Sequence, residues 1–273
     1  MRVLFVGDIV GRPGRSALAH WVPRVRRERS IDLVIANGEN AAAGAGITAK
    51  VIDQIVAAGV DVITTGNHAW DKREGIPLIE EGRVLRPANY PPGVVGTGSQ
   101  VARTRSGEQV GVLNLQGRAF MRAIDCPFRV AKREIERLHS DTIAIIVDMH
   151  AEATAEKLAM GRYLDGEVAA VIGTHTHVQT ADEQILPGGT AYITDVGMTG
   201  PHDSVIGMET EASINRLLTG LPTHLTPARR DARLSGVIID IDMASGRARH
   251  IERLVLALDD AGGDTANHEE END

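Results

Sequence analysis

The chain has 273 residues, a formal net charge of −8 at pH 7 and one cysteine, Cys126, which has no internal disulfide partner. Its content of 42% hydrophobic and 24% charged residues excludes a wholly disordered chain. The acidic balance argues against a duplex nucleic-acid partner, which needs clustered positive charge. No apolar run approaches the roughly 18–20 residues that span a bilayer, and the first residues lack the pattern of a signal peptide. We therefore expect a cytoplasmic protein with no membrane partner.

Short runs rich in valine and isoleucine alternate with helical patterns along the chain. The runs predict buried strands at residues 2–6, 33–36, 60–64, 110–115, 143–149 and 169–172, and the helical patterns predict helices at 15–28, 49–58, 131–138 and 154–164. The alternation predicts βαβ units with right-handed crossovers and a largely parallel sheet. The prolines and glycines of residues 85–104 predict an irregular excursion, and residues 106–108 predict a hairpin turn after it.

The pattern changes after residue 180. Turn signals at 187–189 and 245–246 predict two hairpins, which join strands 184–186 and 191–194 and strands 236–243 and 249–258. We expect residues 1–258 to form a single domain of layered α/β type. Residues 259–273 contain seven acidic residues and two glycines and predict a flexible, solvated tail.

Polar residues follow five of the predicted strands at their carboxyl ends. In an open parallel sheet, binding sites form outside the carboxyl ends of the strands. We therefore expect the five segments to deliver their side chains to one edge of one sheet. The candidate residues are Asp8, Glu39, Asn40, Asn67, His68, His150, His175 and His177.

Each candidate also has an ordinary structural interpretation when it is taken alone. Asp8 can cap or turn the chain after a strand, and Asn67 and His68 can form a turn. A lone histidine such as His150 can be a buried side chain with satisfied hydrogen bonds. His175 and His177 are the strongest local signal, because residues i and i+2 of an extended segment face the same way. The coincidence of all five segments at one edge favours a binding site.

The types of side chain indicate the chemistry of that site. Imidazole, carboxylate and amide ligands without a thiolate are typical of a site that binds Fe, Mn or Zn. They do not suit a structural zinc site, which is rich in cysteine. Seven candidate ligands exceed what one ion needs, which favours two metals bridged by a carboxylate. Two ions roughly 3.5–4 Å apart activate a water and stabilise the leaving oxygen of a phosphoryl displacement. His68, which is in excess for ligation, is then a candidate proton donor to that oxygen.

Several strings in the sequence resemble a known family. The strings Gly66-Asn67-His68 and Gly173-Thr-His-Thr-His177, with Asp8 after the first strand, resemble the calcineurin-like metallophosphoesterases. Further strings resemble one bacterial branch, the YmdB-like family, described as 2′,3′-cyclic-nucleotide phosphodiesterases. The resemblance implies an α/β fold with a four-layer α/β/β/α sandwich. The strings lie at residues 7–15, 37–44, 65–71, 148–154, 173–180 and 194–200.

The resemblance also implies a di-metal centre and a role for each candidate residue. His68 matches the catalytic histidine of the family, which acts as the proton donor. The branch is associated with iron, and manganese is the alternative. By position, Asp8, Asn40 and His177 would hold one metal, Asn67, His150 and His175 would hold the other, and Glu39 would bridge the two.

The first metal site departs from the wider superfamily. Val10 stands where a histidine usually follows the aspartate by two residues, and Glu39 stands where the bridging residue is usually an aspartate. Asn40 replaces the missing imidazole, so this site is richer in oxygen ligands. The branch shares these changes, which affect the identity of the metal more than the function.

The leading hypothesis is a di-metal phosphodiesterase that hydrolyses small phosphodiesters, above all 2′,3′-cyclic nucleotides to 3′-nucleotides, by a metal-bridging hydroxide with His68 as proton donor. Another metallohydrolase, such as a phosphomonoesterase or an amidohydrolase, is a second enzyme hypothesis, although the late position of His175 and His177 disfavours the amidohydrolase. A metal-dependent nucleotide-binding sensor with incidental slow phosphatase activity is the non-enzymatic alternative. Trp70 could stack on a base or belong to the core. The acidic charge is compatible with a homo-oligomer.

Overall fold

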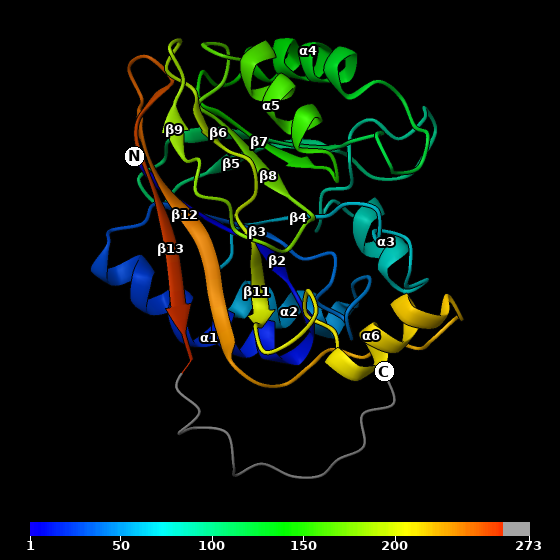
Figure 1. Cartoon of the computed structure of the whole chain (residues 1–273). Coiled ribbons are helices and arrows are strands. Elements are labelled where there is room, and N and C mark those ends of the chain that lie inside the picture. The colour runs from blue at the N-terminus through cyan, green and yellow to red at the C-terminus, as the bar shows by residue number, and fades with distance from the viewer. Residues whose placement is uncertain (259–273) are drawn as a thin grey trace.

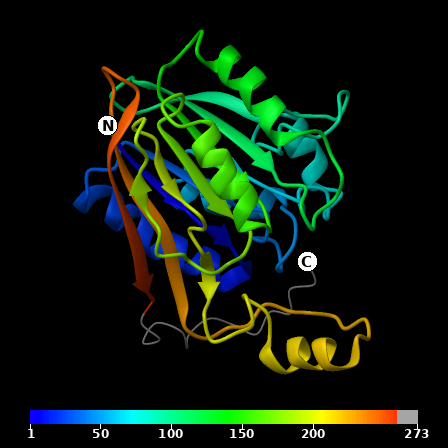
Figure 2. The same ribbon diagram turned by 45° about the horizontal axis from the view of Figure 1, so that its top comes forward.

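A computed structural model describes residues 1–258 of the chain (Figure 1). The acidic tail expected at residues 259–273 lies outside the described residues. Two β-sheets are stacked in the middle of the molecule, and helices cover both outer sides (Figures 1 and 2).

The first sheet has the strand order β2-β11-β12-β1-β3-β4, with β13 beside β12. β1, β3 and β4 are parallel, and β2 is parallel to β11. β12 runs antiparallel to β1, β11 and β13. The strands are β1 (Arg2–Val6), β2 (Asp8–Ile9), β3 (Leu33–Asn37), β4 (Val62–Thr64), β11 (Met198–Pro201), β12 (Ala232–Asp242) and β13 (Arg247–Ala257).

The second sheet has the strand order β5-β6-β7-β8-β10-β9. Its four central strands are parallel, and the two edge strands β5 and β9 are antiparallel to their neighbours. The strands are β5 (Ser99–Arg103), β6 (Gln109–Gln116), β7 (Ile145–His150), β8 (Ala170–Thr174), β9 (Gln184–Ile185) and β10 (Ala191–Ile193).

Helices complete the two outer layers. α1 and α2 pack on the first sheet, and α4 and α5 cover the second (Figure 1). Among residues 1–258, no helix combines the length and the apolar character needed to cross a bilayer. The helices are α1 (Gly11–Glu28), α2 (Ala49–Ala57), α3 (Gly75–Glu80), α4 (Pro127–Leu138), α5 (Thr154–Tyr163) and α6 (Thr210–Thr219).

The side chains of β1 show how the layers are held together. Successive residues of a strand point to opposite faces of the sheet. Leu4 and Val6 belong to the apolar cluster under α1 and α2, whereas Val3 and Phe5 belong to the cluster that the two sheets share. A third cluster joins the second sheet to α4 and α5. These three apolar layers separate four layers of structure, so the predicted α/β/β/α sandwich is confirmed.

The strands and helices predicted from the sequence are present, with ends that differ by a few residues. The expectation of one largely parallel sheet is wrong, because β1, β3 and β4 belong to one sheet and β6, β7 and β8 to another. Apolar runs indicate that a strand is buried but not which strand lies beside it. The excursion at residues 85–104 contains β5, which the predicted turn joins to β6. α3 and α6 were not predicted.

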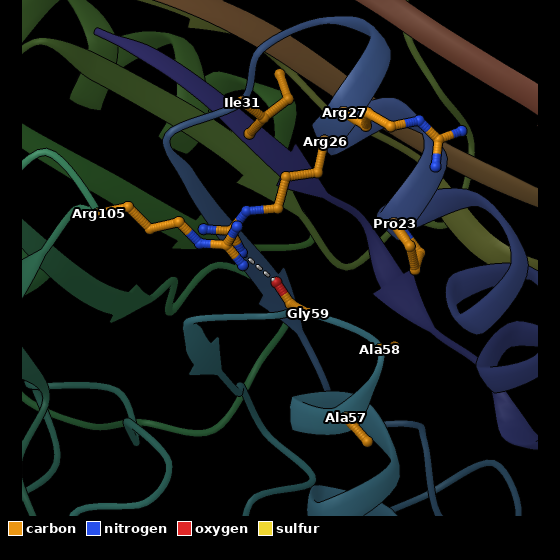
Figure 3. A pocket seen from close by; sticks show the side chains of 8 residues that line it. All are labelled: Pro23, Arg26, Arg27, Ile31, Ala57, Ala58, Gly59 and Arg105. Atoms are coloured by element: carbon orange, nitrogen blue, oxygen red, sulfur yellow. Dashed lines mark hydrogen bonds between the residues drawn. The ribbon is translucent and has the colours of Figure 1, made fainter.

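A cavity of about 420 Å³ lies at the amino ends of β3 and β4 (Figure 3). Arg26 of α1 lines this cavity, and its Nη1 donates a hydrogen bond to the carbonyl oxygen of Gly59 at 2.8 Å. The same guanidinium forms an ion pair with Asp61 at 3.1 Å. Arg26 therefore ties the last turn of α1 to the connection between α2 and β4, at the end of the sheet opposite to the carboxyl ends of these strands.

Candidate metal centre

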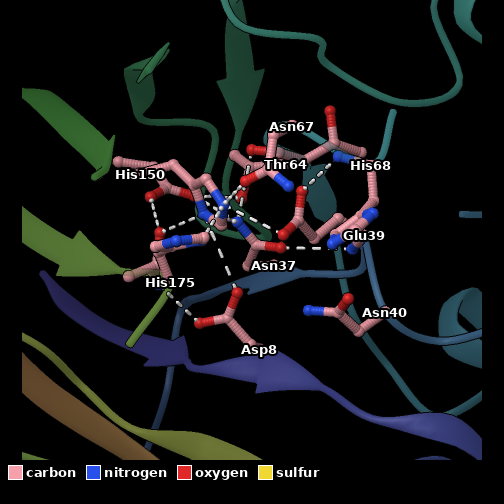
Figure 4. Close-up of polar contacts among 12 residues, drawn as sticks. Asp8, Asn37, Glu39, Asn40, Thr64, Asn67, His68, His150 and His175 are labelled. Carbon is pink, nitrogen blue, oxygen red and sulfur yellow. Dashed lines mark hydrogen bonds and ion pairs between the residues drawn. The ribbon is translucent and has the colours of Figure 1, made fainter. Parts of the chain in front are cut away.

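The predicted site residues gather where the two sheets meet (Figure 4). They follow the carboxyl ends of β1, β3 and β4 in the first sheet and of β7 and β8 in the second. The expectation that one edge of one sheet supplies all of them is therefore wrong. Each sheet contributes part of the site, and the contacts between these parts cross from one sheet to the other.

His150 is at the centre of these contacts. It is the last residue of β7 and is fully buried. Its Nε2 lies 2.9 Å from Oε1 of Glu39, 3.1 Å from Oδ1 of Asn67 and 3.1 Å from Nδ1 of His175 (Figure 4). A ring nitrogen carries either one proton or one lone pair, so it cannot satisfy three such partners at once. The converging atoms of Glu39, His150 and His175 suit a metal ion, because their ligand atoms all lie within 4.8 Å of one another.

Asp8 adds a second buried carboxylate. The side chain has no exposure to solvent, and its Oδ2 accepts a hydrogen bond from the backbone N–H of His175 at 3.1 Å. Among the described residues, its Oδ1 has no hydrogen-bond partner, and Nδ1 of His150 lies 3.8 Å away. A buried carboxylate oxygen without a donor is costly. A cation at this position would remove that cost, so the residues present fit a metal.

Asn40 and His177 form the other side of the site. Asn40 is buried, and its Nδ2 lies 3.1 Å from Nε2 of His177. Nδ1 of His177 lies 2.8 Å from the carbonyl oxygen of Ile206, which can only accept a hydrogen bond. The proton of the neutral ring is therefore on Nδ1, and Nε2 keeps its lone pair. This arrangement is typical of a histidine that binds a metal through Nε2.

The charges of the site depend on one another. Burial raises the pKa of Asp8. Burial also opposes the ionisation of Glu39, but the positive charge and hydrogen bond of His150 lower the Glu39 pKa overall. Burial would lower the pKa of His150, but the negative charges of Glu39 and Asp8 raise it overall. Burial and the positive charge of His150 lower the pKa of His175 to about 3. The proton on His150 thus stabilises the negative charges of Glu39 and Asp8. A bound metal ion would supply positive charge in its place.

Sequence reasoning missed the residues that orient His150. The buried carboxylate of Asp148 accepts hydrogen bonds from Thr174 Oγ1 at 2.7 Å and from Asn37 Nδ2 at 3.1 Å. Oγ1 of Thr174 also lies 2.9 Å from Nδ1 of His150. Burial raises the pKa of Asp148 to about 6. The position of Asp148, two residues before His150 on the same face of β7, is the signal that could have found it.

The structure corrects the expected geometry of His175 and His177. These residues are not in an extended segment, because their φ angles are 101° and 65°. Positive φ values are uncommon for residues other than glycine. His175 lies beside His150, with Nε2 3.1 Å from a carboxylate oxygen of Glu152, and His177 lies beside Asn40. The two imidazoles thus contact different parts of the site.

His68 lies at the rim of the site. Its backbone N–H donates a hydrogen bond to Oε2 of Glu39 at 3.0 Å. Its side chain is 36% exposed, and its Nδ1 lies 2.7 Å from Oδ2 of Asp71. The contact with Asp71 leaves Nε2 as the ring nitrogen that a substrate could meet. Trp70 packs against the apolar cluster under α1 and α2 and makes an edge-to-face contact with Tyr90, with 5.6 Å between ring centroids.

Comparison with known proteins identifies the family. A model of the family "YmdB-like protein" matches residues 4–254. The chain belongs to this family. It is 48% identical over 257 residues to a 2′,3′-cyclic-nucleotide 2′-phosphodiesterase of Bacillus subtilis, and the match covers 94% of this chain and 97% of the relative. The resemblance expected from the sequence motifs is therefore confirmed.

Two solved structures share the fold of this YmdB-like protein. A hypothetical protein from Thermus thermophilus has a TM-score of 0.89 and 44% identity, over 94% of this chain and 99% of its own. A phosphatase from Mycoplasma pneumoniae has a TM-score of 0.88 and 34% identity, over 94% of this chain and 93% of its own. These relatives support a phosphodiesterase or phosphatase activity, and the cluster around His150 supports a metal site.

Gly66 gives a test of the close packing around His150. A Cβ atom at this position would lie 2.1 Å from Cδ2 of His150 and 2.5 Å from Oε2 of Glu39. We predict that Gly66→Ala displaces these side chains and weakens Mn²⁺ binding by about tenfold or more, measured by isothermal titration calorimetry. Gly220→Ala is the control, because a Cβ atom there has no neighbour within 4 Å; its left-handed φ of 68° makes alanine cost stability at the end of α6, without contact with the site. Equal Mn²⁺ affinity in both variants would contradict the arrangement.

Proposed function

We propose that this YmdB-like protein is a metal-dependent phosphodiesterase that hydrolyses 2′,3′-cyclic nucleotides to 3′-nucleotides. The observation that carries the proposal is the convergence of Glu39, Asn67 and His175 on Nε2 of His150. The name of the Bacillus relative supports the substrate class, because 48% identity extends over nearly the whole of both chains.

We assign the residues of the site to two metal ions, with iron as the expected metal and manganese as its alternative. One ion would be held by Asp8, Asn40 and His177, and the other by Asn67, His150 and His175, with Glu39 shared between them. Oδ1 of Asp8, which has no hydrogen-bond partner among residues 1–258, and the lone pair on Nε2 of His177, which faces Asn40, support the first set. When bound, the metals would supply Lewis-acid stabilisation of the phosphate and activation of the attacking water.

His68 is the proposed proton donor to the leaving ribose oxygen. Its contact with Asp71 fixes the orientation of the ring, and its backbone hydrogen bond to Glu39 holds it beside the site. Cleavage of the bond between phosphorus and O2′ leaves a 3′-phosphate, and the O2′ atom takes a proton from Nε2 of His68. The exposed position of His68 allows solvent to return that proton. We further propose that the protein works in the cytoplasm on small phosphodiesters.

Product analysis tests the proposed activity. We predict that protein loaded with Fe²⁺ or Mn²⁺ converts 2′,3′-cyclic AMP to 3′-AMP, resolved from 2′-AMP by liquid chromatography. Accumulation of 2′-AMP would contradict the assigned leaving oxygen. Binding of 2′,3′-cyclic AMP with no turnover, by protein shown to contain both metals, would contradict the enzyme and favour the nucleotide sensor.

The role of His68 predicts a separation between metal binding and turnover. We expect His68→Ala to retain its metal content, because its side chain is outside the proposed ligand set, and to lose on the order of 10²–10⁴ in turnover. Elemental analysis and steady-state kinetics measure the two quantities. His250→Ala, at an exposed position of β13, is the matched control and should behave as the wild type. Loss of metal from His68→Ala would make His68 a ligand instead of a proton donor.

A further inference from the structure

A buried ion pair lies beside the two histidines that follow β8. Lys157 of α5 and Asp195, which follows β10, have no exposure to solvent, and Nζ of Lys157 lies 2.7 Å from Oδ2 of Asp195. Neither residue belongs to the proposed ligand set. Burial of two charges is costly, and it is repaid only when good geometry and further hydrogen bonds satisfy both groups.

The carboxylate of Asp195 holds the residue between the two histidines. Its Oδ2 accepts hydrogen bonds from the backbone N–H of Thr176 at 3.0 Å and from Oγ1 of Thr176 at 2.8 Å. Its Oδ1 accepts a hydrogen bond from the backbone N–H of Gly197 at 2.8 Å. With Lys157, the carboxylate thus has four donors, and two of them belong to Thr176.

The segment that Asp195 holds has an unusual backbone. His175 and His177, on either side of Thr176, have φ angles of 101° and 65°. Such conformations persist when the surrounding structure imposes them. Asp195 accepts hydrogen bonds from the backbone and side chain of Thr176, between the two histidines. The backbone N–H of His175 donates a hydrogen bond to Asp8. The positions of both imidazoles therefore depend on the Asp195 carboxylate.

Lys157 in turn fixes the place and charge of Asp195. Its aliphatic chain packs closely on β8, because a Cβ atom at Gly173 would lie 2.9 Å from Cδ of Lys157. The ammonium group of Lys157 balances the negative charge of Asp195, and an Asp195 without it would be a buried anion with no charged partner.

We infer that the Lys157–Asp195 ion pair is a positioning device for the metal centre, which sets His175 and His177 through Thr176. The inference rests on the proposed function, because it takes these two histidines as metal ligands. Lys157 and Asp195 act through other residues and do not themselves bind the metal or the substrate. The pair lets the fold hold two histidine ligands in a conformation that the isolated segment would not keep.

The test compares metal affinity with stability in full-length variants. Metal-free protein is titrated with Mn²⁺ by isothermal titration calorimetry, and unfolding is followed by circular dichroism. We expect Lys157→Met and Asp195→Asn to weaken Mn²⁺ binding by about 10- to 100-fold. Thr176→Val keeps the ion pair and removes one hydrogen bond, so we expect a smaller loss of about 3- to 10-fold. This milder variant decides the question if the other two do not fold.

A second ion pair, away from the site, supplies the control. Arg26 lines the cavity at the amino ends of β3 and β4 (Figure 3), and it pairs with Asp61; the Arg26 side chain is 9% exposed and the Asp61 side chain 32% exposed. We expect Arg26→Met and Asp61→Asn to lower the melting temperature and to leave Mn²⁺ affinity unchanged. If Lys157→Met, Asp195→Asn and Thr176→Val bind Mn²⁺ within about twofold of the wild type, the pair is only structural and the inference is wrong.

The same titration separates this inference from the proposed function. Wild-type protein that binds Mn²⁺ but hydrolyses no phosphodiester would contradict the proposed function, and the variants would still test the positioning of the ligands. Wild-type protein that binds no Mn²⁺ would contradict the metal centre and therefore both. Weaker Mn²⁺ binding in the site variants with unchanged binding in the controls would support the inference whatever the substrate is.

Discussion

The burial of carboxylates and imidazoles together is the constraint on which the rest of the site depends. Asp8 and Glu39 are almost completely buried, and each places an oxygen against His150. Such groups stay charged away from water only when positive charge or hydrogen-bond donors surround them. The proton of His150 and the backbone N–H groups of His68 and His175 meet this need in part. Metal ions would meet it fully.

The four-layer fold makes this burial feasible. Three apolar clusters hold the sheets and helices in place, so the ends of five strands can carry polar residues without loss of the core. The backbone approaches itself very closely at the junction of the two sheets. A Cβ atom at Gly7 would lie 1.9 Å from the carbonyl oxygen of Gly197, so only glycine lets the chain before Asp8 reach the segment after Asp195.

Much of this arrangement could be predicted from the sequence, because polar residues at the ends of apolar runs mark a site. The residues Asp8, Glu39, Asn67, His150 and His175 were found in this way, and the structure brings them into one network of contacts. The division into two sheets could not be predicted from apolar periodicity, which does not specify strand neighbours. The resemblance to the metallophosphoesterases implied the sandwich instead.

The supporting residues show the limit of local patterns. Lys157 and Asp195 have no spacing that marks them as functional, and a lysine on α5 would be expected on the surface. Their roles arise only from tertiary contacts among α5, the segment after β8 and the segment after β10. The left-handed conformations of His175 and His177 are likewise imposed by these contacts, whereas their alternating sequence favours an extended strand.

The central claim is that the junction of the two sheets binds two metal ions. Anomalous diffraction from crystals of the full chain grown with Mn²⁺ tests it most directly. The account predicts two anomalous peaks, one on Nε2 of His150 and Nδ1 of His175 and the other on Asn40 and Nε2 of His177, with Glu39 in contact with both. A single peak, or peaks only at exposed carboxylates away from His150, would contradict the account.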